Sequence, residues 1–153
     1  MVYSRRIAPF LLLSLFLAGS HMNANAQRSG PLAAAVANRR ADEVTSLLAS
    51  GVSPDDRDER GQEAIIIAAS TDQFAIANIL VDRGANIWAA NRLGFTPALF
   101  AFTSHVSANS PEGTAREIFI SKLKGRGYPW PPPWQNEVVA LRSSGNWPPA
   151  QAK

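Results

Sequence analysis

Two neighbouring side chains, Ser104 and His105, are of the types that can form a nucleophile and a general base. A catalytic serine usually lies on a glycine-flanked turn, and an acidic residue orients its histidine. No glycine flanks Ser104, and the sequence places no Asp near it. We therefore interpret His105 as an exposed loop residue, and a hydrolase that uses it is an alternative hypothesis.

The sequence also lacks the usual signals for a metal or cofactor. It contains no Cys, and His105 is the one histidine after residue 26, so disulfides, thiolate catalysis and common zinc sites are excluded. The acidic run at residues 55–60 resembles a calcium loop, but it has no glycine at its sixth position and contains two arginines. We expect a solvated hairpin tip there. No glycine-rich phosphate loop is present, so we predict no catalysis and no cofactor.

The N-terminal segment, residues 1–26, has the pattern of a secretory signal peptide. Arg5 and Arg6 precede an apolar run over residues 10–18, and a small-x-small cleavage site ends at Ala26. The apolar run is shorter than the ~20 residues that span a bilayer. We predict cleavage after residue 26, export by the general secretory route rather than the twin-arginine route, and a bacterial periplasmic or secreted protein.

The charge of the chain argues against binding to nucleic acid or to a membrane. The formal net charge is +3, from 15 basic and 12 acidic side chains. Without residues 1–26, which include Arg5 and Arg6, 13 basic side chains remain against 12 acidic ones. A charge near +1 produces no large field for phosphates or anionic lipids. We therefore expect no nucleic-acid partner and, after signal cleavage, no membrane association.

The sequence contains residues of the same type that recur at a fixed interval of about 33 residues. Gly51 and Gly84 are separated by this interval, and so are Gly61 and Gly94. The same offset links further small and apolar residues: Ala35, Ala68 and Ala101; Pro31, Ala64 and Pro97; Leu47 and Leu80. A fixed period of this length is typical of an array of helical repeats.

The second repeat indicates how each unit folds. We expect Glu63 to cap a short apolar helix that begins at Ala64, in which two alanines at positions 68 and 69 allow close packing. Apolar residues at helical spacing then predict a second helix over residues 74–81. Gly84 ends that helix, because glycine readily adopts the left-handed conformation found after helix C-termini.

With these features the chain resembles the ankyrin-repeat family. Residues 94–101, Gly-Phe-Thr-Pro-Ala-Leu-Phe-Ala, are close to the family's Gly-x-Thr-Pro-Leu-His-x-Ala opening, and residues 80–87 match its Leu-Leu-x-x-Gly-Ala-Asp-Val closure. Thr96 should cap the third unit's first helix, with Pro97 in its first turn. The resemblance implies an all-α solenoid of stacked helix-turn-helix units with β-turn or hairpin tips. We predict a repeat domain over residues 27–127, with units at about 28–57, 58–90 and 91–127.

The sequence departs from the family pattern in two ways. Glu63 and Ala64 replace Thr-Pro, and apolar residues occupy the usual histidine position: Ala33, Ile66 and Leu99. In the third unit the spacing from Leu80 to Leu123, and from Gly84 to Gly127, exceeds one period by about ten residues. This difference predicts an insertion near 104–114 with loop composition. It is either a tolerated surface insertion or a binding finger.

The segment 128–153 is rich in Pro and Trp and does not follow the repeat. Prolines over 128–134 predict an extended, polyproline II segment, followed by a short helix over 135–142 and a frayed tail from Gly145 to Pro149. We interpret it as a C-terminal cap that covers the last helix pair with four apolar side chains: Trp130, Trp134, Val138 and Leu141. A proline-rich ligand for another protein is the alternative.

The resemblance also implies where a partner would bind, because ankyrin repeats bind through hairpin tips and the concave face of their first helices. At the tips the candidates are Arg57, Glu59, Arg60, Gln62, Trp88, Ala90, Arg92, Leu93 and Phe95. At the ends of the first helices they are Ser70, Thr71, Thr103 and Ser104. Trp88 stands where the family has a small polar residue. It is either an interface hot spot or packs locally on Leu93 or Phe95.

These features together predict a monomeric, non-catalytic module in the bacterial periplasm that binds another protein. The most specific hypothesis is an immunity-type inhibitor of a toxin or enzyme. The alternatives are an assembly or stress-protection factor for a periplasmic enzyme, and a secreted effector that binds a host protein.

Overall fold

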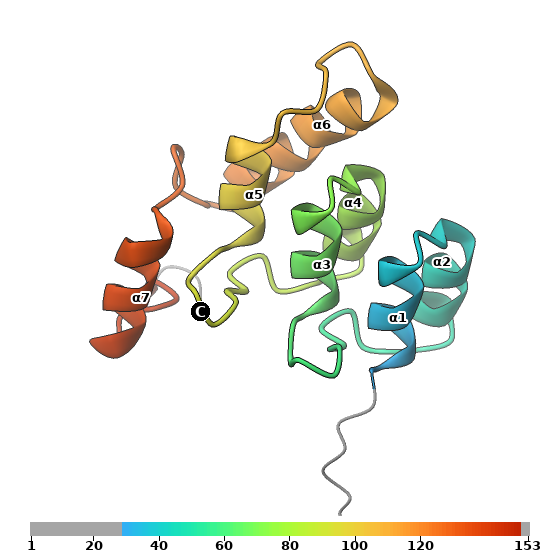
Figure 1. The fold of residues 1–153 in the computed structure, drawn as a ribbon, viewed down its shortest axis with the longest axis horizontal. Coiled ribbons are helices and arrows are strands. Elements are labelled where there is room, and N and C mark those ends of the chain that lie inside the picture. The colour runs from blue at the N-terminus through green and yellow to red at the C-terminus, as the bar shows by residue number, and fades with distance from the viewer. Residues whose placement is uncertain (1–28, 151–153) are drawn as a thin grey trace, which may run out of the picture.

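The computed structural model describes residues 29–150, which form three stacked helix pairs followed by a single helix (Figure 1). The predicted signal peptide over 1–26 lies outside the described residues. The helices are α1 (Pro31–Ala37), α2 (Ala41–Ala49), α3 (Ala64–Ser70), α4 (Phe74–Asp82), α5 (Pro97–Thr103), α6 (Pro111–Gly125) and α7 (Gln135–Ser143). The described chain has no strand, and one isolated antiparallel bridge joins Arg57 and Glu63 in a hairpin. The all-α repeat solenoid is confirmed.

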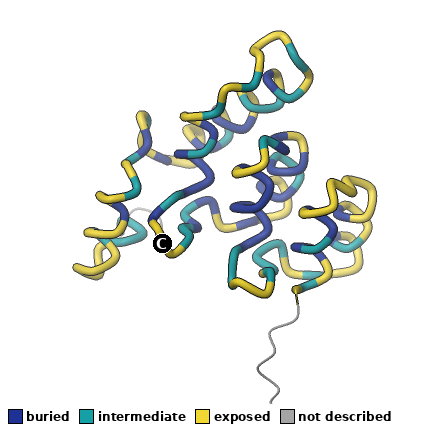
Figure 2. The backbone as a smooth tube through the Cα atoms, viewed as in Figure 1, coloured by how far each residue is buried: buried dark blue, intermediate teal, exposed yellow. Residues whose placement is uncertain are grey.

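The first helices of the pairs form one layer and the second helices form another. α1, α3 and α5 pack in a row, and α2, α4 and α6 pack behind them (Figure 1). Ala35, Ala68 and Ala101, at the same position in each unit, are 0–2% exposed. Their small side chains let adjacent helices approach closely. Burial is most complete in the central pair (Figure 2).

The predicted helix ends are largely confirmed, with one exception. The Thr96 side chain accepts a hydrogen bond from the backbone N–H of Leu99 at 3.1 Å, and Pro97 lies in the first turn of α5. Gly84 follows α4 with a φ of +86°, a conformation that costs other residues free energy. Glu63 holds the N-cap position of α3, but its side chain makes no cap, because its carboxylate pairs with Arg57.

Carboxylates that are distant in the chain cap two of the helices. Asp56 accepts hydrogen bonds from the backbone N–H groups of Leu32 and Ala33 at 2.9 and 3.3 Å. Glu112 accepts from Phe74 and Ala75, at the start of α4, at 2.9 and 3.3 Å. The expectation that the whole 55–60 run is a solvated tip was therefore wrong. Asp56 instead satisfies backbone donors in the first turn of α1.

The additional residues of the third unit extend both a loop and a helix. The connection between α5 and α6 is longer than the one between α3 and α4, and α6 has 15 residues where α4 has 9. Ser110 accepts a hydrogen bond from the N–H of Gly113 at 3.0 Å, and Pro111 opens the helix. Residues 111–114, predicted as loop, are thus helical, because Ser followed by Pro is a helix-starting pair.

The segment after residue 127 lies against the end of the stack. α7 follows the predicted helix closely, Val138 is fully buried and Trp130 packs edge-on against Phe102 with ring centroids 5.6 Å apart. Trp134 meets the same ring at 6.3 Å but is 50% exposed. Residues 128–134 contain no helix or strand, and the Trp130–Pro131 peptide bond among them is cis.

The tail after α7 is also more ordered than predicted. Trp147 is partly buried and contacts the rings of Trp88 and Tyr128. The expectation of a frayed tail was wrong at this residue, because a large aromatic ring gains from burial.

Two matched glycines allow the docking of α7 to be tested. Gly61 and Gly94 occupy the same hairpin position with φ of +76° and +86°. A Cβ on Gly61 would meet nothing within 4 Å, whereas one on Gly94 would lie 2.2 Å from the carbonyl oxygen of Gln135 in α7. We expect Gly61→Ala to lower the free energy of unfolding by about 1 kcal/mol, and Gly94→Ala by about 2–4 kcal/mol. Urea unfolding measures both, and equal losses would contradict this docking.

The cap that Asp56 provides is testable in the same way. We expect Asp56→Ala to cost about 1–2 kcal/mol of unfolding free energy, because the first turn of α1 loses its side-chain acceptor. Asp42→Ala, an exposed change of equal charge in the first turn of α2, is the control and should cost less. Hydrogen exchange should accelerate at Leu32 and Ala33 in the Asp56 variant alone.

Candidate functional site

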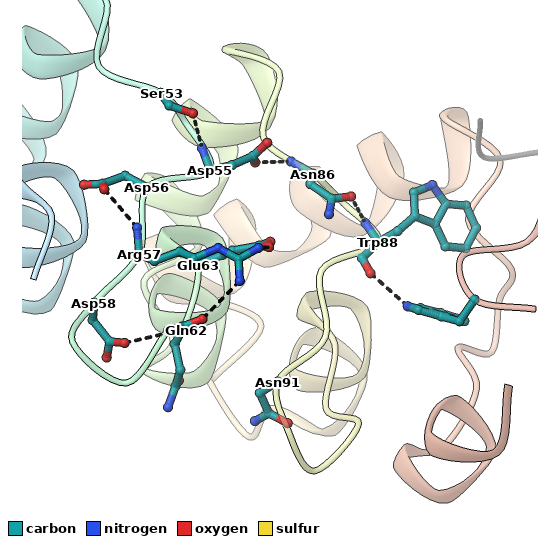
Figure 3. Close-up of polar contacts among 12 residues, drawn as sticks. Ser53, Asp55, Asp56, Arg57, Asp58, Gln62, Glu63, Asn86, Trp88 and Asn91 are labelled. Carbon is teal, nitrogen blue, oxygen red and sulfur yellow. Dashed lines mark hydrogen bonds and ion pairs between the residues drawn. The ribbon is translucent and has the colours of Figure 1, made fainter. Parts of the chain in front are cut away.

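The two complete hairpin tips are built by the same side-chain hydrogen bonds. Asp58 accepts hydrogen bonds from the backbone N–H groups of Arg60 and Gln62, at 2.9 and 2.8 Å. Asn91, at the equivalent position of the next repeat, accepts from the corresponding N–H groups at 3.0 Å in both cases. Figure 3 shows both side chains in their hairpin loops. Such bonds hold a turn in one conformation, so the tips present their side chains from a rigid backbone.

Further polar contacts join the first hairpin to the second. The backbone N–H of Asp55 donates to the Ser53 hydroxyl at 3.2 Å, and at the equivalent place in the next repeat that of Trp88 donates to the Asn86 side chain at 3.0 Å. The Asp55 carboxylate also accepts a hydrogen bond from the backbone N–H of Asn86 at 2.7 Å (Figure 3). Consecutive tips are therefore held at a fixed spacing.

The base of the first hairpin contains a charged pair. Arg57 pairs with Glu63 across the bridge (Figure 3). Burial raises the pKa of the Glu63 carboxyl, and the positive charge of Arg57 opposes this shift. The Arg57 side chain is thus held along its own hairpin, although it is half exposed.

Trp88 packs against the C-terminal segment rather than projecting from a tip. Its ring stacks on Tyr128 with centroids 4.3 Å apart and meets Trp147 edge-on at 5.6 Å. The indole N–H of Trp147 donates to the Trp88 carbonyl at 3.1 Å. Of the two interpretations, local packing is the one observed, but on neither Leu93 nor Phe95. Trp88 takes the place of Asp55 in the next repeat, where aromatic contacts replace a hairpin-to-hairpin hydrogen bond.

The other candidates at the tips differ in exposure. The exposed ones are Arg57, Glu59, Arg60, Arg92 and Leu93, while Gln62 and Ala90 are half-buried. Leu93 is the apolar member of this set, and 69% of it is exposed. Phe95 is half-buried and stacks on Phe100 with centroids 5.4 Å apart, so it supports the tip.

The candidates at the ends of the first helices make internal hydrogen bonds. The hydroxyls of Ser70 and Thr71 donate to the carbonyl of Ile67, and that of Thr103 donates to Leu99. These hydroxyls bond to backbone carbonyls in the last turns of their own helices. Contact with a partner at these residues stays a prediction.

The structure brings an acidic residue to Ser104 that the sequence did not place there. The Ser104 hydroxyl donates to the Asp72 carboxylate at 2.7 Å, because the turn after α3 lies beside the turn after α5. His105 is exposed, as expected. The serine therefore joins two repeats.

The structure shows one groove that the sequence did not reveal. Three adjoining hollows lie between the two tips and α7, and Arg92 lines all of them. Arg60 lines two and so does Arg142, while Arg57 lines one. We name this surface the arginine groove. Sequence reasoning missed Arg142, since nothing in the local pattern of α7 indicates which hairpin it faces.

Two contacts position Arg142 in the arginine groove. Its guanidinium donates to the backbone carbonyl of Asn91 at 2.8 Å. Gly94 allows α7 to approach the same hairpin closely. The groove therefore depends on the docking of the C-terminal helix.

The described part of the chain contains no group of three or more His, Asp or Glu side chains placed to hold a metal ion. None of the helices over residues 29–150 has the length and apolar character needed to cross a bilayer.

Comparison with known proteins agrees with this repeat architecture. A family model described as ankyrin repeats (3 copies) matches residues 5–105. The potassium channel KOR1 of Oryza sativa subsp. japonica is 39% identical to this chain over 85 residues. That alignment covers 56% of this chain but 9% of the channel, so the chain spans less than a tenth of that relative's length. The family match ends before α6 and α7.

The aromatic cluster at Trp88 gives a testable pH dependence. Burial raises the pKa of Tyr128 to about 12, and the neighbouring Thr96 side chain acts in the opposite direction. Within residues 29–150 the Tyr128 hydroxyl has no hydrogen-bond partner. Because the unfolded chain loses this proton near pH 10, folding stability should fall by about 2–3 kcal/mol as the pH rises from 10 to 12. Denaturant unfolding at each pH measures this.

Tyr128→Phe is the matched variant for this effect. It should remove the Tyr128 part of the pH dependence and change stability at pH 7 by less than about 1 kcal/mol, because the hydroxyl makes no hydrogen bond to any residue among 29–150. The other tyrosine of the chain is Tyr3, within the predicted signal peptide. Tyrosinate absorbance of the protein without residues 1–26 therefore reports Tyr128 alone, and titration near pH 10 would contradict its burial.

Proposed function

The chain belongs to the ankyrin-repeat family, and from this premise we propose that it binds a partner protein through its hairpin tips and the adjoining arginine groove. Ankyrin repeats form a protein–protein interaction module. The observation that carries the proposal is the pair of rigid tips, whose backbones are fixed by Asp58 and Asn91. Arg60, Arg92 and Leu93 extend from these tips as exposed side chains. A rigid surface loses little entropy on binding.

The distribution of polar bonds supports the tips over the other candidate positions. The hydroxyls at the ends of α3 and α5 are already bonded within the chain. Arg60 and Arg92 have no side-chain hydrogen bond or ion pair to any residue among 29–150. Side chains that are free and mounted on fixed turns suit a partner better than side chains that complete a helix.

We place this binding in the bacterial periplasm, with the chain acting as an immunity-type inhibitor of a toxin or enzyme. The support is the signal-peptide pattern over residues 1–26, together with the absence of a catalytic arrangement among the described residues. An inhibitor of this kind would cover the active site of its target with the tips.

The proposal predicts that changes at the second tip abolish partner capture. In affinity purification from native cells, the double variant Arg92→Ala/Leu93→Ser should lose at least about tenfold of the captured partner, because it removes a charge and an apolar contact at a hot spot. The control Arg83→Ala/Arg126→Ala changes two exposed residues at the ends of α4 and α6 and should capture normally. Matching thermal unfolding of the variants excludes a folding defect.

Two further readouts test the location and the role. Fractionation should place the chain in the periplasm without residues 1–26, and the purified partner should lose activity when the wild-type chain is added. A cytoplasmic location, or a partner that the chain activates or stabilises, would overturn the inhibitor role while leaving protein binding intact.

A further inference from the structure

The arginine groove has a charge that points to the chemistry of its partner. Its lining residues include four arginines, at positions 57, 60, 92 and 142, and no acidic residue. They come from two hairpins and from α7, so three separate segments converge on one surface. Repeat geometry alone does not require this, since Arg142 lies outside the repeats.

The acidic side chains nearest to these arginines in the chain are engaged elsewhere or lie outside the groove. The Asp58 carboxylate accepts two backbone hydrogen bonds within its own turn. Glu63 is buried and pairs with Arg57. Glu59 is exposed at the first tip but does not line the groove. The positive charge of Arg60, Arg92 and Arg142 is therefore largely uncompensated within the groove.

The four guanidinium groups differ in how free they are. Arg57 forms an ion pair with Glu63, and Arg142 donates a hydrogen bond to the Asn91 carbonyl. Arg60 and Arg92 have no polar side-chain partner within residues 29–150. A free guanidinium on a rigid turn is suited to a bidentate contact with a carboxylate. The first contacts should therefore form at these two residues.

Apolar side chains accompany the charges. Leu93 lines one hollow and is 69% exposed, and Val139 lines another and is 41% exposed. Nucleic acid would call for a longer track of cations with aromatic rings to stack on the bases, and the lining residues include no aromatic ring. A polypeptide that carries both carboxylate and apolar side chains matches this mixture.

We propose that the arginine groove binds an acidic segment of the partner protein, with Asp or Glu carboxylates on Arg60 and Arg92 and an apolar side chain against Leu93 and Val139. This deepens the proposed function and rests on it. Arg142 extends the positive surface, so α7 contributes directly to recognition as well as ending the stack.

A peptide-binding experiment on the full chain tests the proposal. The probe is a fluorescently labelled peptide of about twelve residues, long enough to span the groove, that contains Glu, Asp and Leu, and its control carries Gln and Asn instead of the acids. Fluorescence anisotropy should show saturable binding of the acidic peptide alone, weakening as salt rises. Arg60→Ala/Arg92→Ala should weaken it about tenfold, as expected for the loss of two exposed charge pairs.

The control Arg83→Ala/Arg126→Ala removes the same charge away from the groove and should leave the affinity within about twofold. Equal weakening by both double variants would mean that net charge alone attracts the peptide, and would overturn the proposal. So would binding of the neutral peptide, the absence of saturable binding, or stronger competition by a single-stranded oligonucleotide than by unlabelled peptide.

Leu93→Ser separates this inference from the proposed function. If Leu93→Ser prevents capture of the native partner and Arg60→Ala/Arg92→Ala does not, the tips bind a protein but the acidic-segment proposal is wrong. If neither variant affects capture, the binding surface itself is misplaced and both proposals fail.

Discussion

The structure depends on the inability of a single helix pair to bury its own apolar surface. α3 shows this most clearly, because Ile65, Ile66 and Ile67 are consecutive and each is at most 9% exposed. A short helix with apolar side chains around its whole circumference needs neighbours on several sides. α1 and α5 provide them within the same layer, and α4 provides the contact from the second layer. The stacking of the repeats is thus a condition for the central pair to fold.

Hydrogen bonds between segments that are distant in the chain add to this apolar packing. Asp56 in the first hairpin caps α1, and Asp55 beside it accepts a hydrogen bond from the backbone of the second hairpin. Glu112 of the third unit caps α4. The Asp56 and Glu112 carboxylates satisfy backbone N–H groups that helix N-termini leave without partners. The additional length of the third unit therefore has a structural use, since it brings Glu112 to α4. The Asp55 hydrogen bond links the first hairpin directly to the second.

The C-terminal segment covers the last repeat and also forms part of the candidate binding surface. No fourth repeat follows within the described residues, so α7 and the aromatic rings of Tyr128 and Trp147 cover what a further hairpin would cover. Because α7 docks against Gly94, Arg142 comes to lie beside the tips. The docking of α7 therefore both ends the array and completes the arginine groove. The groove is not a general property of repeats.

Local sequence pattern was enough to predict the repeat period, the helix pairs, the glycines after the helices and the Thr96 cap, because these follow from residue spacing and backbone preference. It also indicated which residues lie at the tips. The roles of Asp56, Glu112 and Trp88 emerged from the packed chain alone, since they bind partners 23 to 59 residues away in the chain. The same holds for the place of Arg142 in the groove. Such pairings depend on how elements pack, and a helix carries no local signal for the surface it will meet.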